Sequence, residues 1–360
     1  MFYVKQKLSN FSKRYVRNIL AWLYYVSGSL ELNKGKIIIL MYHRVLSDDD
    51  PLISLVQPGM YVTKNVFDMQ INYISKHYSI ISLDNLLDII NGKTFDKNKK
   101  YCVITFDDGW LDNYINAYPV LKKHNAPATI FLTTSLIGTE EWFWPDKVKY
   151  LLNNISFKSE YHSIQIKNEN IFKLIFDCIE KLKIATVEGR IKLEDELINK
   201  LKECEIEKIH STLAEIFKLV KISLPIDRVL LNWDEVRTMS NKNITFGSHT
   251  CNHKILTILN EDEIKKELKD SKDKLKYEKV SFTPVFCYPN GNYNNIVQKL
   301  VKDAGYSAAV TTKFGAIEIA TLDKYSLNRI GIHNDVSLSA MLFSFHLSGI
   351  WQRLKYKSKR

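Results

Sequence analysis

The sequence predicts an α/β fold in which parallel strands alternate with helices, and three observations indicate it. Short apolar runs recur along the chain, amphipathic helical patterns separate most of them, and polar residues gather where several of the runs end. Strands that alternate with helices pair in parallel, so their carboxyl ends share one edge of a sheet or barrel. Chemistry is expected at that edge.

The strands are expected in six short apolar runs, which are continuous rather than alternating and are therefore typical of buried parallel strands. The runs are 37–41, 101–106, 129–133, 244–246, 285–288 and 308–311. Apolar residues at helical spacing predict helices over 64–77, 82–91, 110–124, 262–277 and 295–304.

This alternation is interrupted between residues 147 and 230. The stretch is rich in Lys and Glu, predicts two or three amphipathic helices and contains no strand of comparable strength. We interpret it as a helical insertion. The expected organisation is a basic amphipathic helix at 1–32, a catalytic barrel formed by 33–146 and 231–336, the insertion at 147–230 and a basic amphipathic segment at 337–360.

The formal net charge of +11 is concentrated at the two ends of the chain. Residues 1–30 and 346–360 carry five basic residues each and no acid, and so account for ten of the eleven charges. The nearly neutral body gives no reason to expect a nucleic-acid partner, because a groove for a phosphate backbone needs many Lys and Arg residues.

Both basic ends are also rich in apolar and aromatic residues, which leaves two interpretations open. They are either membrane-surface helices or terminal helices that pack on the domain with solvated basic faces. Neither apolar run approaches the roughly 20 residues needed to span a bilayer. Peripheral membrane association through the termini is therefore one of the two expectations.

The cysteines and the N-terminal sequence bear on localisation. Five cysteines, an odd number without CxxC spacing, argue against a disulfide framework and fit a reducing compartment. A long charged leader with a short Trp- and Tyr-rich apolar stretch is a weak signal peptide, so we interpret the terminus as mature. The expected location is cytoplasmic, with peripheral binding at the inner face of the plasma membrane if the termini contact lipid.

Two adjacent carboxylates, Asp107 and Asp108, follow the run at 101–106. One such acid can hold a cation while its neighbour takes a proton from water. The alternative is that the pair only caps the helix expected to begin near Trp110.

Two histidines, His249 and His253, follow the run at 244–246. On a helical turn, residues four apart share a face, so both imidazoles could reach one ion, and imidazole with carboxylate suits zinc. Alone, such a pair is often a surface or core feature. Together with the strand-end carboxylates it indicates a metal site with two histidines, one aspartate and open coordination positions.

Five segments carry a resemblance to a known family. They are Leu40-Met41-Tyr42-His43-Arg44-Val45, Thr105-Phe106-Asp107-Asp108-Gly109, Trp233-Asp234-Glu235-Val236, Ser248-His249-Thr250-Cys251-Asn252-His253 and Tyr288-Pro289-Asn290-Gly291. With these motifs the chain resembles the NodB-homology polysaccharide deacetylases, carbohydrate esterase family 4. The first segment resembles a subgroup acting on poly-N-acetylglucosamine and related bacterial glycans. The resemblance covers roughly residues 35–145 and 230–335 and implies a distorted (β/α)7-type barrel.

The resemblance also implies roles for individual residues. Asp107 would be the general base, and Asp108, His249 and His253 would hold a divalent metal, with Zn²⁺ the expected ion. The turn that contains Tyr288 and Asn290 would provide a backbone donor for the oxyanion.

The chain departs from the commoner family pattern at two positions. Cys287 stands where an Arg is usual, and Asn290 stands where an aromatic residue is usual. We expect Arg329 to replace the missing Arg beside Asp107. The general acid is expected to be His43, at the end of an early strand, with His333 as its rival.

The function that follows is removal of N-acetyl groups from GlcNAc-type sugars of a bacterial surface polysaccharide or its lipid-linked precursor. The partner would be an N-acetylated glycan. Two alternatives stay open: an amidase or O-deacetylase that uses the same metal centre, and a catalytically silent scaffold at the membrane.

Overall fold

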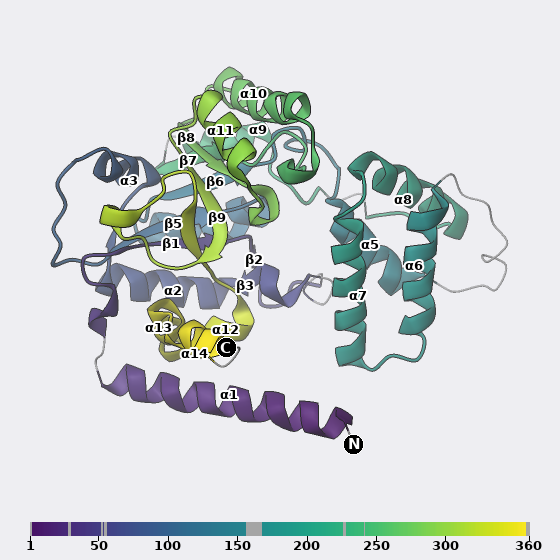
Figure 1. The fold of residues 1–360 in the computed structure, drawn as a ribbon, viewed down its shortest axis with the longest axis horizontal. Helices are drawn as coiled ribbons and strands as arrows, with labels where there is room; N and C mark the ends of the chain where they lie inside the picture. The colour runs from purple at the N-terminus through teal and green to yellow at the C-terminus, as the bar shows by residue number, and fades with distance from the viewer. Residues whose placement is uncertain are drawn as a thin grey trace. The chain divides into compact units, whose positions relative to one another are not determined.

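The computed structural model describes residues 2–27, 30–51, 53, 56–155, 168–225, 228–240 and 242–357. The chain divides into two compact units, and Figure 1 labels most of their helices and strands. The first unit comprises Met1–Asp50, Gln57–Gly138 and Leu231–Arg360, and the second comprises Pro51–Val56 and Thr139–Leu230.

The first unit contains a closed parallel barrel, which confirms the predicted fold class. Its strands are β1 (Ile37–Tyr42), β5 (Tyr101–Phe106), β6 (Ala128–Leu132), β7 (Ile244–Ser248), β8 (Phe282–Cys287), β9 (Ala308–Phe314) and β10 (Leu327–Gly331). Each strand is parallel to the next, and the barrel closes because β1 pairs with both β5 and β10. The short strand β4 (Ser79–Ile80) pairs with the beginning of β5, and β6 pairs with its end.

The strands are buried on both faces, as their continuous apolar sequences indicated. Every residue of β5 and of β6 is buried. Side chains that point inward fill the barrel, and those that point outward are covered by helices, so no polar alternation remains. Strand β10 was not among the six expected runs, because its sequence Leu327-Asn328-Arg329-Ile330-Gly331 contains two polar residues.

Helices follow most of these strands. They are α2 (Lys64–His77), α3 (Leu83–Ile90), α4 (Tyr118–Lys123), α9 (Trp233–Ser240), α10 (Glu261–Tyr277) and α11 (Asn295–Asp303). Side-chain caps fix three of the starts, because Ser82, Asn260 and Asn294 each accept a hydrogen bond from a backbone N–H of the first turn. The remaining short elements are β2 (Arg44–Leu46), β3 (Tyr61–Thr63), η1 (Leu30–Asn33), η2 (Pro58–Met60), η5 (Leu256–Ile258), η6 (Pro289–Gly291) and η7 (Ile319–Thr321).

The helix expected over 110–124 is replaced by two elements. A π-helical turn, η3 (Asn113–Ala117), precedes the shorter α4. Within this turn the Asn113 and Asn116 side chains donate to the backbone carbonyls of His43 and Val45. Wide π turns of this kind are frequent at functional sites. Here the turn ties the segment after Asp108 to the segment that carries His43.

The second unit is helical and has a core of its own. Its helices are α5 (Trp144–Asn154), α6 (Glu169–Leu182), α7 (Val187–Leu201) and α8 (Ile206–Val220). Val148, Ile175, Leu201, Leu213 and Ile216 are almost completely buried in that core. Four described helices therefore replace the two or three that were expected, and the first of them begins before residue 147.

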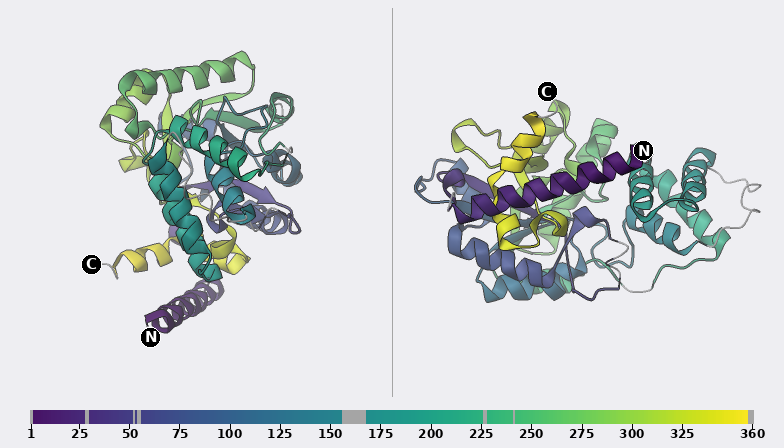
Figure 2. Two further views of the ribbon diagram at one scale, coloured as in Figure 1. Left: turned by 90° about the vertical axis from the view of Figure 1, so that its right-hand side faces the viewer. Right: turned by 90° about the horizontal axis from the view of Figure 1, so that it is seen from below.

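The first helix of the chain packs against its last helices in the first unit. Helix α1 (Phe2–Val26) runs beside α13 (Ala340–Ser348), which is flanked by α12 (Asn334–Ser337) and α14 (Ile350–Lys357) (Figure 2). Ala21, Tyr24 and Phe345 are buried where α1 contacts α13. The ring centroids of Tyr24 and Phe345 are 5.8 Å apart. No helix in the described ranges combines the length and apolarity that a bilayer crossing requires.

Candidate active site

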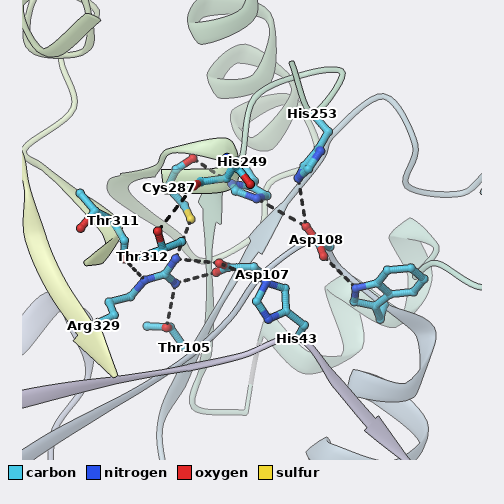
Figure 3. Close-up of polar contacts among 12 residues, drawn as sticks. His43, Thr105, Asp107, Asp108, His249, His253, Cys287, Thr311, Thr312 and Arg329 are labelled. Atoms are coloured by element: carbon cyan, nitrogen blue, oxygen red, sulfur yellow. Dashed lines mark hydrogen bonds and ion pairs between the residues drawn. The ribbon is translucent and has the colours of Figure 1, made fainter. Parts of the chain in front are cut away.

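The candidate site lies at the carboxyl ends of the barrel strands, as expected (Figure 3). His43 follows β1, Asp107 and Asp108 follow β5, His249 follows β7, and Cys287 ends β8. Arg329 comes from within β10. Parallel strands end on the same rim of a barrel, so residues more than 200 positions apart in sequence become neighbours.

A buried ion pair joins Asp107 to Arg329. The two guanidinium nitrogens lie 2.6 and 2.7 Å from the two carboxylate oxygens, and the Arg329 side chain has no exposed surface. The other three N–H groups of Arg329 donate to the Thr311 carbonyl, the Thr105 hydroxyl and the Cys287 sulfur. All five donors are therefore satisfied, and the guanidinium is fixed in one orientation.

The pair controls the charge of Asp107. Burial alone would raise the pKa of this carboxyl, but the charge of Arg329 and its hydrogen bonds outweigh burial and leave the pKa below its ordinary value. Asp107 is thus held as a carboxylate, which is the form that a general base needs.

Asp108, His249 and His253 form a second cluster. Their facing atoms are close: Asp108 Oδ1 lies 3.4 Å from His249 Nε2 and 3.3 Å from His253 Nε2. Ligand bonds of 2.0–2.1 Å in a tetrahedral site place ligand atoms about 3.3 Å apart. The spacing of these three atoms therefore fits a divalent metal such as zinc.

Hydrogen bonds to the far atoms orient this cluster. His249 Nδ1 lies 2.8 Å from the Cys287 carbonyl, which can only accept, so Nδ1 donates and Nε2 is the nitrogen that faces Asp108 and could bind a metal. The Trp110 indole N–H donates to Asp108 Oδ2 at 2.9 Å, so only Oδ1 faces the histidines. Each group thus presents one ligand atom to the same point.

The segment that carries the two histidines is a loop, so the prediction of a helical turn there was wrong. Thr250 and His253 have φ angles of 65° and 57°, a conformation that side chains with a Cβ rarely adopt. The buried carboxylate of Glu267 on α10 holds the loop by accepting from the backbone N–H groups of Cys251 and Asn252 and from the Asn252 side chain. Strain of this kind persists at functional sites where surrounding contacts fix the backbone.

A second group of potential ligands, Asp107, His249 and Cys287, is a poorer metal site. Both oxygens of Asp107 are occupied by Arg329, and His249 Nδ1 is a donor. Burial raises the pKa of the Cys287 thiol, which disfavours the thiolate that binds metal. Of the two groups, the one built on Asp108 suits a cation.

His43 lies beside Asp107, with His43 Nε2 3.9 Å from Asp107 Oδ2 and the imidazole 17% exposed. Burial lowers the pKa of His43, and the charges of Asp108 and Asp107 offset part of that effect. His333 instead pairs with Asp335 and lies near the ring of His346. The geometry favours His43 over His333 as the acid, and the assignment stays a prediction.

The two predicted residues of the oxyanion turn lie in different environments. Tyr288 is completely buried, its hydroxyl donates to the Tyr325 carbonyl, and its N–H donates to the Val310 carbonyl. It packs in the core, which is not where a substrate-binding side chain is expected. Asn290 is exposed and has a φ of 56°. The Gly291 N–H donates to Tyr288, and Pro289 has none, so an oxyanion donor from this turn would have to be Asn290.

Two supporting residues, Asp112 and Glu267, were missed in the sequence. Asp112 accepts from Arg44 at 2.8 Å and from the Val45 N–H, and Arg44 stacks on Trp110 with its guanidinium carbon 4.4 Å from the ring centre. Glu267 was missed too, although it is an acid on the buried face of α10 between Ile264 and Leu268. A charged residue on an apolar helix face is the signal that could have identified it.

A carboxylate held in its ionised form, a neighbouring imidazole and a three-residue cluster that could hold a metal lie on the rim of an α/β barrel, an arrangement suited to a hydrolase that adds water to a carbonyl group. The comparison with known proteins agrees. The family model described as polysaccharide deacetylase matches residues 95–309, and the chain belongs to this family.

Individual relatives are distant. YxkH of Bacillus subtilis, whose name places it among the polysaccharide deacetylases, is 23% identical over 85% of this chain and 75% of its own length. The poly-beta-1,6-N-acetyl-D-glucosamine N-deacetylases of Staphylococcus epidermidis and Staphylococcus aureus are 34% and 24% identical over 31% and 52% of this chain. These alignments span 40% and 60% of the staphylococcal proteins.

Solved structures share the fold. The Streptococcus pyogenes deacetylase PplD in complex with acetate has a TM-score of 0.55 and 22% identity over 86% of this chain and 98% of its own. IcaB from Ammonifex degensii has a TM-score of 0.53 and 15% identity over 86% and 97%. At these identities the likeness concerns the fold alone.

Proposed function

We propose that this deacetylase removes N-acetyl groups from GlcNAc-type sugars of a bacterial surface polysaccharide or of its lipid-linked precursor. The observation that carries the proposal is the pairing of the Asp108, His249 and His253 cluster with Asp107 and His43 on one barrel rim. The names of the staphylococcal relatives support the sugar, since they describe proteins acting on poly-beta-1,6-N-acetyl-D-glucosamine.

The chemistry follows from the arrangement of the side chains. Asp107, ionised beside Arg329, takes a proton from the attacking water, whose oxygen bonds to the acetamide carbon. His43 gives a proton to the sugar nitrogen as the carbon–nitrogen bond breaks. Acetate is released, and the sugar keeps a free amine. A divalent metal held by Asp108, His249 and His253 would polarise the carbonyl and lower the pKa of water.

We propose Zn²⁺ as that metal. Two imidazole nitrogens and one carboxylate oxygen are ligands that zinc favours, and three protein ligands leave room for water and substrate. Metal analysis of protein purified without chelator, followed by activity after chelation and add-back of Zn²⁺, Co²⁺ or Ni²⁺, tests this. Full activity in a chelated, metal-free preparation would contradict it.

The proposed location is the inner face of the plasma membrane, with the enzyme in the cytoplasm and peripherally attached. Support comes from the basic, apolar ends of the chain and from cysteines that are all free. Fractionation of cells that produce the protein, with protease protection of intact spheroplasts, tests the location. Digestion from outside would place it on the opposite face.

The decisive experiment is mass spectrometry of acetyl loss across a panel of acylated substrates. We expect metal-replete wild type to release acetate from GlcNAc oligomers and Asp107→Asn to release almost none. Acetylated xylan and simple sugar amides in the panel address O-deacetylation and amidase activity. No turnover of any substrate by metal-replete protein would favour the silent scaffold.

A further inference from the structure

Helix α1 is apolar on two opposite sides, and only one of them is covered. On the covered side, Ala21 and Tyr24 are buried against Phe345 of α13, and Met341, Leu342, Ile350 and Trp351 complete the contact. One of the two interpretations of the basic ends was that they are terminal helices that pack on the domain. This packing agrees with it for the N-terminal helix.

The other side of α1 carries an uncovered apolar stripe. Tyr15, Ile19, Trp22 and Val26 follow one another at intervals of four, three and four residues, and Val16 and Leu23 lie beside them. Between 43% and 63% of each of these six side chains is exposed. In the sequence the same spacing continues through Phe11, Leu8 and Val4. Single exposed apolar residues are normal, but a contiguous stripe of this size marks an interaction surface.

The charge of the two ends of the chain indicates what kind of surface would bind the stripe. Residues 1–30 and 346–360 contain ten basic residues and no acid, and the helix from the first range, α1, packs on α13 and α14 from the last part of the chain (Figure 2). A second copy of the chain on this face would bring another set of these basic ends close to the first, and that like-charge repulsion opposes dimerisation here. An anionic bilayer satisfies both features, because basic groups attract its headgroups while apolar side chains enter its interface.

The types of residue fit the same partner. Tyr15 and Trp22 are aromatic side chains with one polar atom, a type that prefers the boundary between headgroups and acyl chains. A 25-residue helix is about 37 Å long, which lets it lie in the plane of the interface. We infer that the Tyr15–Ile19–Trp22–Val26 stripe of α1 is a docking face for an anionic lipid bilayer.

Vesicle co-sedimentation of the full-length protein tests this inference. Vesicles of phosphatidylcholine alone are compared with vesicles that also contain phosphatidylglycerol, at low and at high salt. We expect binding to the anionic vesicles, a loss of at least about tenfold in Ile19→Gln with Trp22→Gln, and weaker, more salt-sensitive binding in Lys13→Gln with Arg14→Gln.

The matched control is Tyr277→Gln with Ile296→Gln, which removes two exposed apolar side chains, 77% and 54% exposed, far from α1 in sequence and should bind like wild type. The inference would be overturned if wild type did not bind anionic vesicles, or if the Ile19→Gln/Trp22→Gln variant and the control variant lost binding equally. So would a wild-type dimer, seen by light scattering, that the α1 variant converts to a monomer without any change in vesicle binding. Acetate release from a soluble GlcNAc oligomer should be the same in all variants, so this test is separate from that of the enzymatic function.

Discussion

At the scale of single residues, Arg329 is buried, charged and hydrogen-bonded at every donor. Its two terminal nitrogens match both oxygens of Asp107, and this is the position where it was expected to replace the Arg that is missing at Cys287. Cys287 at the end of β8 accepts one of its N–H groups. Asp107, which follows β5, is thus held by a side chain from β10.

We expect Arg329→Met to lower kcat/KM by at least about 100-fold and to destabilise the fold by roughly 3–5 kcal/mol, because a buried carboxylate would lose its partner. Arg329→Lys keeps the charge without the fork and should lose less activity. Metal content should stay at the wild-type level, since Asp108, His249 and His253 are untouched. Kinetics, urea unfolding and metal analysis measure these effects. Full activity in Arg329→Met would remove Arg329 from the mechanism.

The general acid can be identified by comparing two histidine variants. We expect His43→Gln to reduce kcat by about 10²–10⁴-fold, the usual contribution of a positioned proton donor, and His333→Gln to stay close to wild type. Activated substrates whose leaving group needs no proton should partly rescue His43→Gln. If His333→Gln proved the inactive one, the roles of the two histidines would be reversed.

At the scale of elements, α10 carries the residue that shapes the histidine loop. Glu267 accepts from two backbone N–H groups between His249 and His253, and its helix is fixed at its start by a capping box of Asn260 and Glu263. The helix therefore shapes the loop that carries the two histidines without itself offering an atom to their cluster with Asp108.

We expect Glu267→Gln to weaken metal affinity by about 10–100-fold, as is typical when a group that positions a metal ligand is altered. Asp270→Asn on the same helix is the control, because Asp270 makes an exposed ion pair with Lys266 and should leave affinity unchanged. Competition with a chromophoric chelator measures both. Equal affinities in the two variants would show that the loop holds its shape without Glu267.

Helix α13 contains a buried histidine that makes its packing sensitive to acid. His346 lies against Phe314, its Nε2 donates to the Gly331 carbonyl, and its ionisable neighbours are His333, Asp335 and Arg17. Burial lowers the pKa of His346 to about 4. The unfolded chain, with a pKa near 6.5, binds this proton first, so folded stability falls as the pH drops from about 6.5 toward 4.

We expect this histidine to cost up to about 3 kcal/mol of folding free energy over that interval. His346→Gln keeps a donor for Gly331 without a titrating group. The difference in unfolding free energy between wild type and His346→Gln, followed by urea denaturation, should therefore change across the interval. A difference that stays constant with pH would mean that His346 is not the sensitive group.

At the scale of the whole molecule, the two compact units have separate cores. Leu213 is 1% exposed in the core of the helical unit, and every buried member of that core lies between Trp144 and Ile216. We expect Leu213→Ala to destabilise this unit by about 2–5 kcal/mol and to speed amide exchange in α6, α7 and α8. Exchange in the barrel strands and metal affinity should not change. Equal acceleration in both units would show that they unfold together.

Much of this architecture could be predicted from the sequence, because barrel strands are continuous apolar runs and the site residues stand at their ends. Residues 101–106 and 64–77 were predicted with their observed limits. Strand β10 was missed because Asn328 and Arg329 make its sequence look polar, although Arg329 itself was expected beside Asp107. Glu267 and Asp112 act through contacts with backbone N–H groups, which sequence spacing does not encode, and for Glu267 the one signal is its place on the apolar face of α10.

The position of β1 between β5 and β10 has a consequence for biosynthesis. As the chain leaves the ribosome, β1 can pair with β5 early, but its other edge has no partner until residues 327–331 have been made. An open edge of an apolar strand can pair with other chains. The nascent protein should therefore depend on chaperones until translation is nearly complete, and truncated products that lack β10 should be insoluble.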